Sequence, residues 1–176
     1  MQGTLACSII LLVKANPEDI AAHLLERKLS VGTVESATGG LISNLFTNVA
    51  GSSHFFLGTI VAYSNEIKTG VVGVNPSAIE QHGAVSAVVA EQMAAGGRRI
   101  LGVDICVSDT GIAGPTGGSA DKPVGLFYLG LSYSGGTFSR KCLFHGTRLS
   151  NKRAAAAEAL GWIEELLTGK WTPGLS

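Results

Sequence analysis

Residues 34–40, Val-Glu-Ser-Ala-Thr-Gly-Gly, stand where a strand passes into a helix. Residues 29–34 (LSVGTV) alternate apolar with small or polar side chains, which is typical of a strand. Residues 41–46 (LISNLF) carry apolar side chains at helical spacing. Ser36 is therefore predicted at the carboxyl end of a strand, beside the free amides of a helix start. Those amides and the helix dipole would stabilise an anion next to the hydroxyl, as a nucleophile requires.

The same serine has a simpler interpretation. Ser36 or Thr38 can serve only as the cap of the helix that follows, because hydroxyl side chains are favoured at that position. This segment taken alone does not decide between a cap and a nucleophile.

A second motif, Tyr-Ser-Asn-Glu-Ile-Lys at residues 63–68, follows the apolar run of residues 55–62 (FFLGTIVA), which has the length of a strand. Ser64 or Asn65 can cap a short helix there. Tyr63 and Lys68 are poorly spaced for one helix face, but a strand-to-helix junction can aim both into one pocket. Lys68 could then act as general base for Ser36 if burial lowers its pKa, and Tyr63 could steady the proton. The alternatives are a solvated Lys68 and a Tyr63 that covers the core.

A third motif is the glycine-rich segment of residues 110–118 (TGIAGPTGG), which follows the expected strand at residues 105–107. Its glycines let the backbone approach a ligand and adopt positive φ, so that its amides can form an anion-binding nest. The segment matches neither the dinucleotide-binding fingerprint nor the Walker A loop. An ordinary turn remains the alternative.

The motifs ESATGG, YSNEIK and TGIAGPTGG, followed by KPVGL, resemble in this order the C-terminal domain of CinA, the family of nicotinamide-nucleotide amidases. The resemblance extends from about residue 17 to residue 167. It implies deamidation of nicotinamide mononucleotide to nicotinate mononucleotide with release of ammonia, by a serine nucleophile and a lysine base, without cofactor or metal. Relatives often carry cysteine or another small residue where this chain has Ala37, a change that keeps the size.

On this pattern Ser36 is the nucleophile, Lys68 the base and Tyr63 the supporting hydroxyl. The resemblance assigns the oxyanion side to Thr38, Gly39 and Gly40. It assigns the substrate side to the glycine-rich loop, with Thr110, Gly111, Gly114 and Gly117. Arg148 stands before the expected last helix, where relatives often have an arginine, so it is expected to meet the substrate phosphate or to face solvent.

Composition limits the other classes of function. The 176 residues are 45% hydrophobic and 15% charged, with 13 basic and 13 acidic residues, which gives no electrostatic argument for nucleic acid or a membrane as partner. A weakly charged surface favours a homo-oligomer. The three cysteines are widely spaced and odd in number, so we expect a reducing cytoplasm rather than a disulfide framework. The four histidines are scattered and show no metal-ligand spacing.

The remaining pattern predicts one α/β domain over residues 1–176, with a core at about 17–167. Asn-Pro pairs at 16–17 and 75–76 and a serine at 86 start helices, and a hairpin with its turn at 135–136 joins strands at 124–132 and 138–144. We expect a three-layer α/β/α sandwich with a mixed, mostly parallel sheet. The apolar segment 5–13 is expected as an extra strand or packing arm. The tail 168–176 is expected to be flexible.

Three other classes of protein fit the sequence less well. Ser36 lacks the Gly-x-Ser-x-Gly setting of α/β-hydrolases, and Gly39 stands where β-lactamases need a lysine. A non-catalytic nucleotide- or partner-binding module, linked to competence or DNA damage as relatives are, is the main alternative to an amidase. The joint presence of Ser36, Tyr63 and Lys68 argues against it, because a binding module does not need all three.

Overall fold

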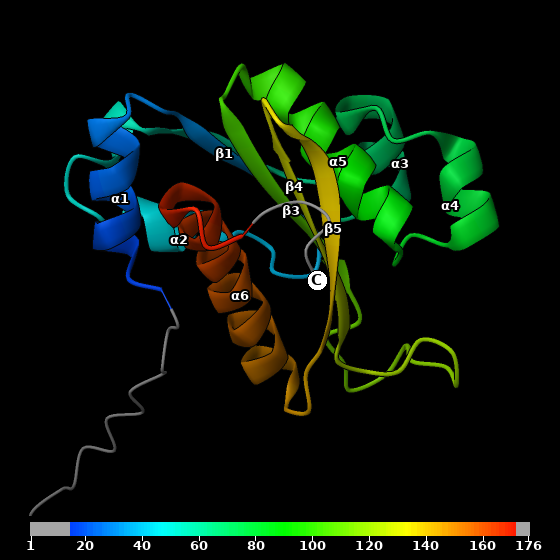
Figure 1. Cartoon of the computed structure of the whole chain (residues 1–176). Coiled ribbons are helices and arrows are strands. Elements are labelled where there is room, and N and C mark those ends of the chain that lie inside the picture. The colour runs from blue at the N-terminus through cyan, green and yellow to red at the C-terminus, as the bar shows by residue number, and fades with distance from the viewer. Residues whose placement is uncertain (1–14, 172–176) are drawn as a thin grey trace, which may run out of the picture.

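The structure is a computed structural model and describes residues 15–171. Five strands form one sheet in the order β2-β1-β3-β4-β5. The elements in chain order are α1 (Pro17–Glu26), β1 (Val31–Glu35), α2 (Leu41–Thr47), η1 (Ser52–His54), β2 (Phe56–Val61), α3 (Asn65–Ile67), η2 (Lys68–Val72), α4 (Pro76–His82), α5 (Ala87–Leu101), β3 (Ile105–Gly111), β4 (Leu126–Tyr133), β5 (Gly136–Leu143) and α6 (Arg148–Thr168). Figure 1 shows helices on both faces of this sheet, so the expected three-layer α/β/α sandwich is confirmed.

The sheet is mixed, as expected, but its parallel part is smaller than the sequence indicated. β1 pairs in parallel with β2 and with β3, whereas the β3–β4 and β4–β5 pairs are antiparallel. The reason is that β3 is followed by a loop and a hairpin instead of a crossover helix, and only a long crossover returns a chain in parallel. The turn of the hairpin lies at residues 134–135, one position before the expected one.

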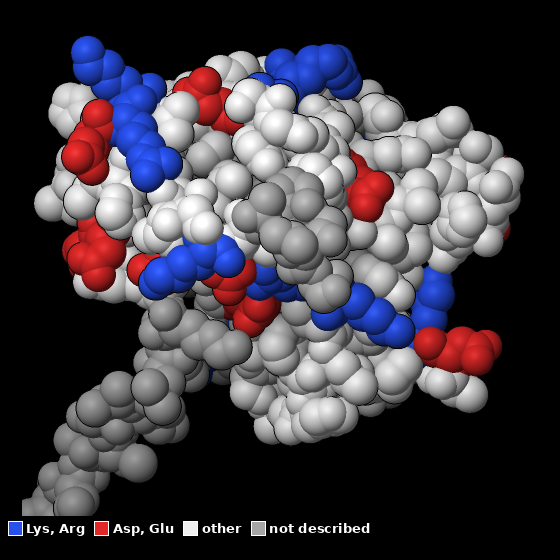
Figure 2. Space-filling view, in the orientation of Figure 1, with Lys and Arg blue, Asp and Glu red and all other residues white. Residues whose placement is uncertain are grey.

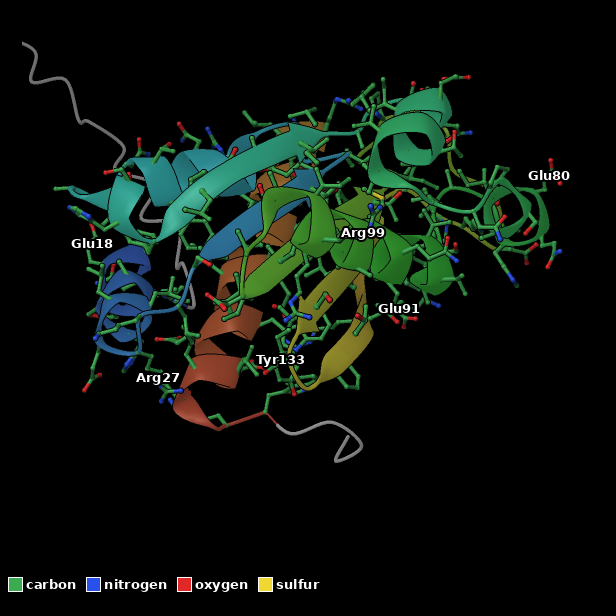
Figure 3. The ribbon with its side chains drawn as sticks, turned by 90° about the horizontal axis from the view of Figure 1, so that it is seen from above. Glu18, Arg27, Glu80, Glu91, Arg99 and Tyr133 are labelled. Carbon is green, nitrogen blue, oxygen red and sulfur yellow. The ribbon has the colours of Figure 1, made fainter. Side chains whose placement is uncertain are left out.

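Among the described residues, the two larger of three buried apolar clusters cover the two faces of the sheet. One joins α1, α2 and α6 to β1, β3 and β4, with Phe46, Leu160 and Trp162 among its fully buried side chains. The other lies under α5 and includes Met93 and Cys106. A Cβ placed on Gly97 of α5 would lie 2.2 Å from Val34 of β1, so glycine permits this close approach of helix and strand. Figure 3 shows Glu91 on this helix, and Glu18 of α1 and Glu80 of α4 at opposite ends of the molecule.

Local capping places the helices near their expected starts. Asn16, Asn75 and Ser86 accept hydrogen bonds from the first-turn amides of α1, α4 and α5. Helix α6 begins earlier than expected, because Thr147 caps it and Arg148 is its first residue. Arg148 is therefore part of the helix and does not precede it.

The beginning of the expected flexible tail contacts helix α6. Thr168 ends α6, and the amides of Lys170 and Trp171 both donate to the carbonyl of Glu165. The Trp171 ring meets the Trp162 ring edge to face at 5.4 Å between centroids. This aromatic contact was not visible as a sequence pattern, and the flexibility of the tail stays a prediction. Residues 172–176 and the apolar segment 5–13 lie outside the described residues.

Charged side chains are sparse on the face drawn in Figure 2, where small groups of both signs are separated by uncharged surface. Between residues 15 and 171, no helix combines the length and apolar character needed to cross a membrane.

Candidate active site

A cavity of about 300 Å³ opens where β1 and β3 end at their carboxyl edge. In α/β sheets this edge is the usual place for a ligand. The cavity is lined by residues from the ends of β1 and β3, from the start of α3 and η2, from the segments before α5 and after β3, and from α6: Ser36, Ala37, Tyr63, Asn65, Lys68, Ala84, Val85, Thr110, Gly111, Ile112, Ala113, Gly114, Thr116, Gly117 and Arg148.

Ser36 and Lys68 meet in this cavity. The Nζ atom of Lys68 lies 2.9 Å from Oγ of Ser36. Ser36 sits directly after β1, and its side chain does not cap α2, whose N-cap is Gly40. Of the two interpretations left open by the sequence, the cap is thereby excluded for Ser36.

Lys68 is held by its local backbone. Ser64 caps α3 by accepting from the amide of Ile67, and the chain then turns through the single π-helical turn η2. From there the amine of Lys68 donates to the carbonyls of Ala62 at 2.8 Å and Tyr63 at 3.2 Å. Two backbone carbonyls can only accept, so they occupy two N–H groups of the amine. The third direction faces Ser36, where a neutral amine presents its lone pair.

Burial favours that neutral amine. The Lys68 side chain is 2% exposed, and this burial lowers the pKa of its amine below the ordinary 10.5. The charges of Asp109 and Glu66 oppose the shift, but desolvation is the larger effect. Since only the neutral form can accept a proton, the lowered pKa suits Lys68 to act as a base.

Tyr63 and Arg148 meet at the rim of the cavity. The Arg148 guanidinium donates to the Tyr63 hydroxyl at 3.1 Å and to the Gly114 carbonyl at 2.9 Å. Tyr63 is 63% exposed, and it reaches Lys68 only through its backbone carbonyl. The structure therefore gives the Tyr63 hydroxyl a different partner from the one expected, the guanidinium of Arg148. Arg148 faces the cavity in agreement with one of its two sequence-based interpretations.

Three amides at the start of α2 are occupied by a side chain of the protein itself. The carboxylate of Glu35 accepts from the amides of Gly40 at 2.7 Å, Ile42 at 3.1 Å and Ser43 at 2.7 Å. Gly40 adopts φ 96°, a conformation open to glycine, and this lets the helix turn back over Glu35. Thr38, Gly39 and Gly40, expected on the oxyanion side, do not line the cavity. The sequence could not show that Glu35 fills the helix terminus.

Asp109 fixes the segment that carries the nucleophile. This fully buried residue of β3 accepts from the amides of Ser36 at 3.0 Å and Thr38 at 3.2 Å. The Thr38 hydroxyl lies between the two carboxyl groups, 2.7 Å from Glu35 and in short contact with Asp109. Burial, with a smaller contribution from Glu35, raises the pKa of Asp109 to about 6. Sequence reasoning missed Asp109 and Glu35, although a carboxylate inside an apolar strand was a signal.

The glycine-rich loop lies on the opposite side of the cavity, and all four residues expected there line it. The Thr110 hydroxyl donates to the Ala84 carbonyl at 2.9 Å, so this side chain supports the wall instead of facing a ligand. Gly111 ends β3, and Gly114 and Gly117 both have φ 91°. Asn65 is a further polar residue of the lining that sequence analysis did not single out.

Metal ligands are not gathered anywhere in the described part of the chain. Within residues 15–171, no group of three or more His, Cys, Asp or Glu side chains is placed to hold a metal ion.

Known proteins place the chain in a family. Residues 14–167 match the family model of the CinA C-terminal domain. A CinA-like protein of Salinibacter ruber is 48% identical over 137 residues, which are 78% of this chain and 33% of that protein. One of Geobacter is 46% identical over 156 residues, 88% of this chain and 38% of its own length. The chain thus spans about a third of the length of these relatives.

Solved structures give the same result. A competence/damage inducible protein of Agrobacterium tumefaciens superposes with a TM-score of 0.80 at 35% identity, covering 86% of this chain and 95% of its own. A CinA superfamily protein of Klebsiella pneumoniae superposes with a TM-score of 0.84 at 27% identity, covering 88% of this chain and 96% of its own. Sequence match and fold agree, and the chain belongs to the family of CinA C-terminal domains.

Proposed function

We propose that this chain is an amidase that hydrolyses the carboxamide of nicotinamide mononucleotide to nicotinate mononucleotide and ammonia. The observation that carries the proposal is the 2.9 Å approach of a buried lysine amine to a serine hydroxyl at the end of a cavity. A nucleophile and a base within hydrogen-bond reach are the elements of covalent amide hydrolysis. The nucleotide as substrate follows from the family resemblance of the three motifs.

The reaction begins with proton transfer from Ser36 to neutral Lys68. The serine oxygen forms a bond to the carboxamide carbon, and a tetrahedral oxyanion results. As the oxyanion collapses, the carbon–nitrogen bond breaks and Lys68 returns the proton to the leaving nitrogen, which departs as ammonia. Water then attacks the acyl-enzyme ester, Lys68 takes the proton of the water, and the serine oxygen leaves with that proton.

The oxyanion needs amide donors that the protein does not already use. The amides of Ser36 and Thr38 donate to Asp109, and that of Gly40 donates to Glu35. Ala37 lines the cavity, and its amide makes no hydrogen bond to another described residue. We therefore assign the amide of Ala37 as an oxyanion donor, a role commonly worth several kcal/mol in the transition state.

The far wall suits the nucleotide part of the substrate. Arg148 has N–H groups beyond the two that bind Gly114 and Tyr63, and a guanidinium pairs well with a phosphate. The glycine-rich loop brings backbone close to the same space. A substrate lying between Ser36 and Arg148 would place its carboxamide at the nucleophile and its phosphate at the entrance.

The deciding experiment is ammonia release from nicotinamide mononucleotide by the purified chain, with nicotinate mononucleotide identified as the second product. The Ser36→Ala and Lys68→Met variants serve as controls for a contaminating amidase. Activity that is equal in all three proteins, or absent from the native protein, would remove the assignment and favour a binding module.

A further inference from the structure

Thr38 joins two buried carboxyl groups beneath the nucleophile. Its Oγ1 atom lies 2.7 Å from Oε2 of Glu35 and in short contact with Oδ1 of Asp109. A threonine hydroxyl carries one proton, so it can donate to one of these oxygens only. If both carboxyl groups were ionised, the other contact would set two oxygen lone pairs against each other. The three groups therefore need a second proton between them.

The remaining contacts show which carboxyl group holds that proton. Oε2 of Glu35 already accepts from the amides of Gly40 and Ile42, and Oε1 accepts from Ser43. An oxygen with two amide donors and the Thr38 hydroxyl around it has its acceptor capacity filled, which suits a carboxylate. Oδ1 of Asp109 has only the Ser36 amide beside Thr38. It can accept one bond and donate one, as a protonated carboxyl oxygen does.

We propose that Asp109 is a positioning residue which carries a proton toward Thr38, so that this buried pair of carboxyl groups holds one negative charge instead of two and Lys68 can release its proton at lower pH. Asp109 acts on the reaction through its neighbours. It fixes the amides on both sides of the reactive segment, at Ser36 and Thr38, and the charge it withholds would otherwise stabilise the protonated amine of Lys68.

The charged groups near Asp109 come from few elements. Glu35 ends β1, Lys68 begins η2, and Lys152 of α6 lies with its amine 3.6 Å from the position of a Cβ on Gly39. Glu35 disfavours ionisation of Asp109, and burial acts in the same direction and more strongly, raising the pKa of Asp109 to about 6. The Thr38 hydroxyl and the two amides act in the opposite direction. The geometry and these effects agree on a carboxyl group that keeps its proton well above its ordinary range.

The inference rests on the proposed function for its effect on catalysis, but its central claim can be tested without substrate. In the native protein labelled with ¹³C at aspartate and lysine, the Asp109 carboxyl carbon is expected to titrate near pH 6, far above an exposed aspartate. Resonances are assigned by comparison with the Asp109→Asn and Lys68→Met variants. An Asp109 carboxyl that is fully ionised from pH 5 upward would overturn the proposal.

The coupling to Lys68 is tested by the lysine side-chain resonance in three variants. Asp109→Asn places a neutral group where the proposal has a protonated carboxyl group, so the Lys68 pKa and the acid limb of the kcat/KM profile are expected to stay at their native values. Thr38→Val removes, at nearly constant shape, the hydroxyl that accepts the Asp109 proton, so Asp109 should ionise more readily and the Lys68 pKa should rise. Thr38→Ser keeps the hydroxyl and should leave the Lys68 pKa at the native value.

The outcomes separate the two proposals. A fall of the Lys68 pKa in Asp109→Asn would overturn the inference, because it would show that Asp109 is charged in the native protein while Lys68 titrates. Equal shifts in Thr38→Ser and Thr38→Val would also overturn it, because the hydroxyl would then carry no proton bridge. A native protein that shows these titrations but does not hydrolyse nicotinamide mononucleotide would contradict the proposed function alone.

Discussion

The Nζ atom of Lys68 lies 2.9 Å from Oγ of Ser36, although 32 positions separate the two residues in the chain. Parallel pairing of β1 and β2 produces this contact, because it brings the carboxyl ends of both strands to the same edge of the sheet. The serine follows one strand directly and the lysine follows the other after a short helical turn.

Replacing Ser36 by alanine should abolish amidase activity and leave the fold intact. The hydroxyl makes its hydrogen bond with Lys68, while the Ser36 amide, which holds Asp109, is unchanged by the substitution. The loss in free energy of unfolding should be about 1 kcal/mol. Ser132→Ala is a matched control, since Ser132 is also buried and bonds one side chain, Thr137, away from the cavity. Turnover by Ser36→Ala at the native rate would exclude Ser36 as the nucleophile.

Replacing Lys68 by methionine should lower kcat at least about a hundredfold while making the fold more stable at pH 7. Burial lowers the Lys68 pKa, so the folded protein binds fewer protons than the unfolded chain, whose lysine titrates at 10.5. Above pH 10.5 the amine is neutral in both states, and its burial costs no protonation free energy. As pH falls from 10.5 through the folded pKa, stability is lost because the unfolded chain binds a proton that the folded protein does not. Chemical unfolding should therefore show that, between pH 7 and 10, the free energy of unfolding of the native protein rises with pH relative to that of Lys68→Met. The exposed Lys141→Met is the control, and a parallel pair of curves would contradict the prediction.

Nicotinamide mononucleotide should be hydrolysed at least roughly a hundredfold better than free nicotinamide, about 2.7 kcal/mol in the barrier. Binding of a remote phosphate can position the carboxamide against Ser36, so its absence should reduce kcat as well as affinity. Arg148→Gln should lose most of this preference, whereas Arg153→Gln, on the exposed side of α6, should keep it. The comparison of kcat/KM for the two substrates, in the native protein and in both variants, tests this preference. Equal values would favour a general amidase for small carboxamides.

The Trp171→Ala variant should lower the free energy of unfolding by about 2–3 kcal/mol without affecting catalysis. Its ring packs on Trp162 and on Phe138 and Tyr133 of the hairpin, at the end of β4 far from the cavity. Thermal unfolding of this variant beside Lys170→Ala, whose side chain is exposed, measures the effect. A free energy of unfolding equal to that of the native protein would mean that the Trp171 ring contacts contribute no stability.

The sequence was sufficient to locate the elements around the site, because each has a local signal. Alternation marks β1, the Gly39–Gly40 pair marks the turn into α2, and Asn-Pro pairs mark α1 and α4. Family resemblance supplied the pairing of Ser36 with Lys68, since their contact depends on the strand order. Strand order has no local signal.

The buried positions of Glu35 and Asp109 could not be predicted from the sequence, for a different reason. Glu35 lies where a helix terminus supplies three amides, and Asp109 lies where the reactive segment supplies two more. The donors of Glu35 follow it by five to eight positions, across the turn into α2. The donors of Asp109, the amides of Ser36 and Thr38, lie more than 70 positions before it. A charged residue in such a position is read as exposed until the tertiary structure provides its partners.

The antiparallel pairing of β3 and β4 has a consequence for changing what the cavity binds. The connection between them, residues 112–125, leaves and returns at the same edge of the sheet, so its length and sequence are free of the constraint that a crossover imposes. Ser36 and Lys68 belong to other connections, after β1 and after β2. Substitutions confined to the loop would therefore change the lining of the cavity without moving the proposed reactive pair.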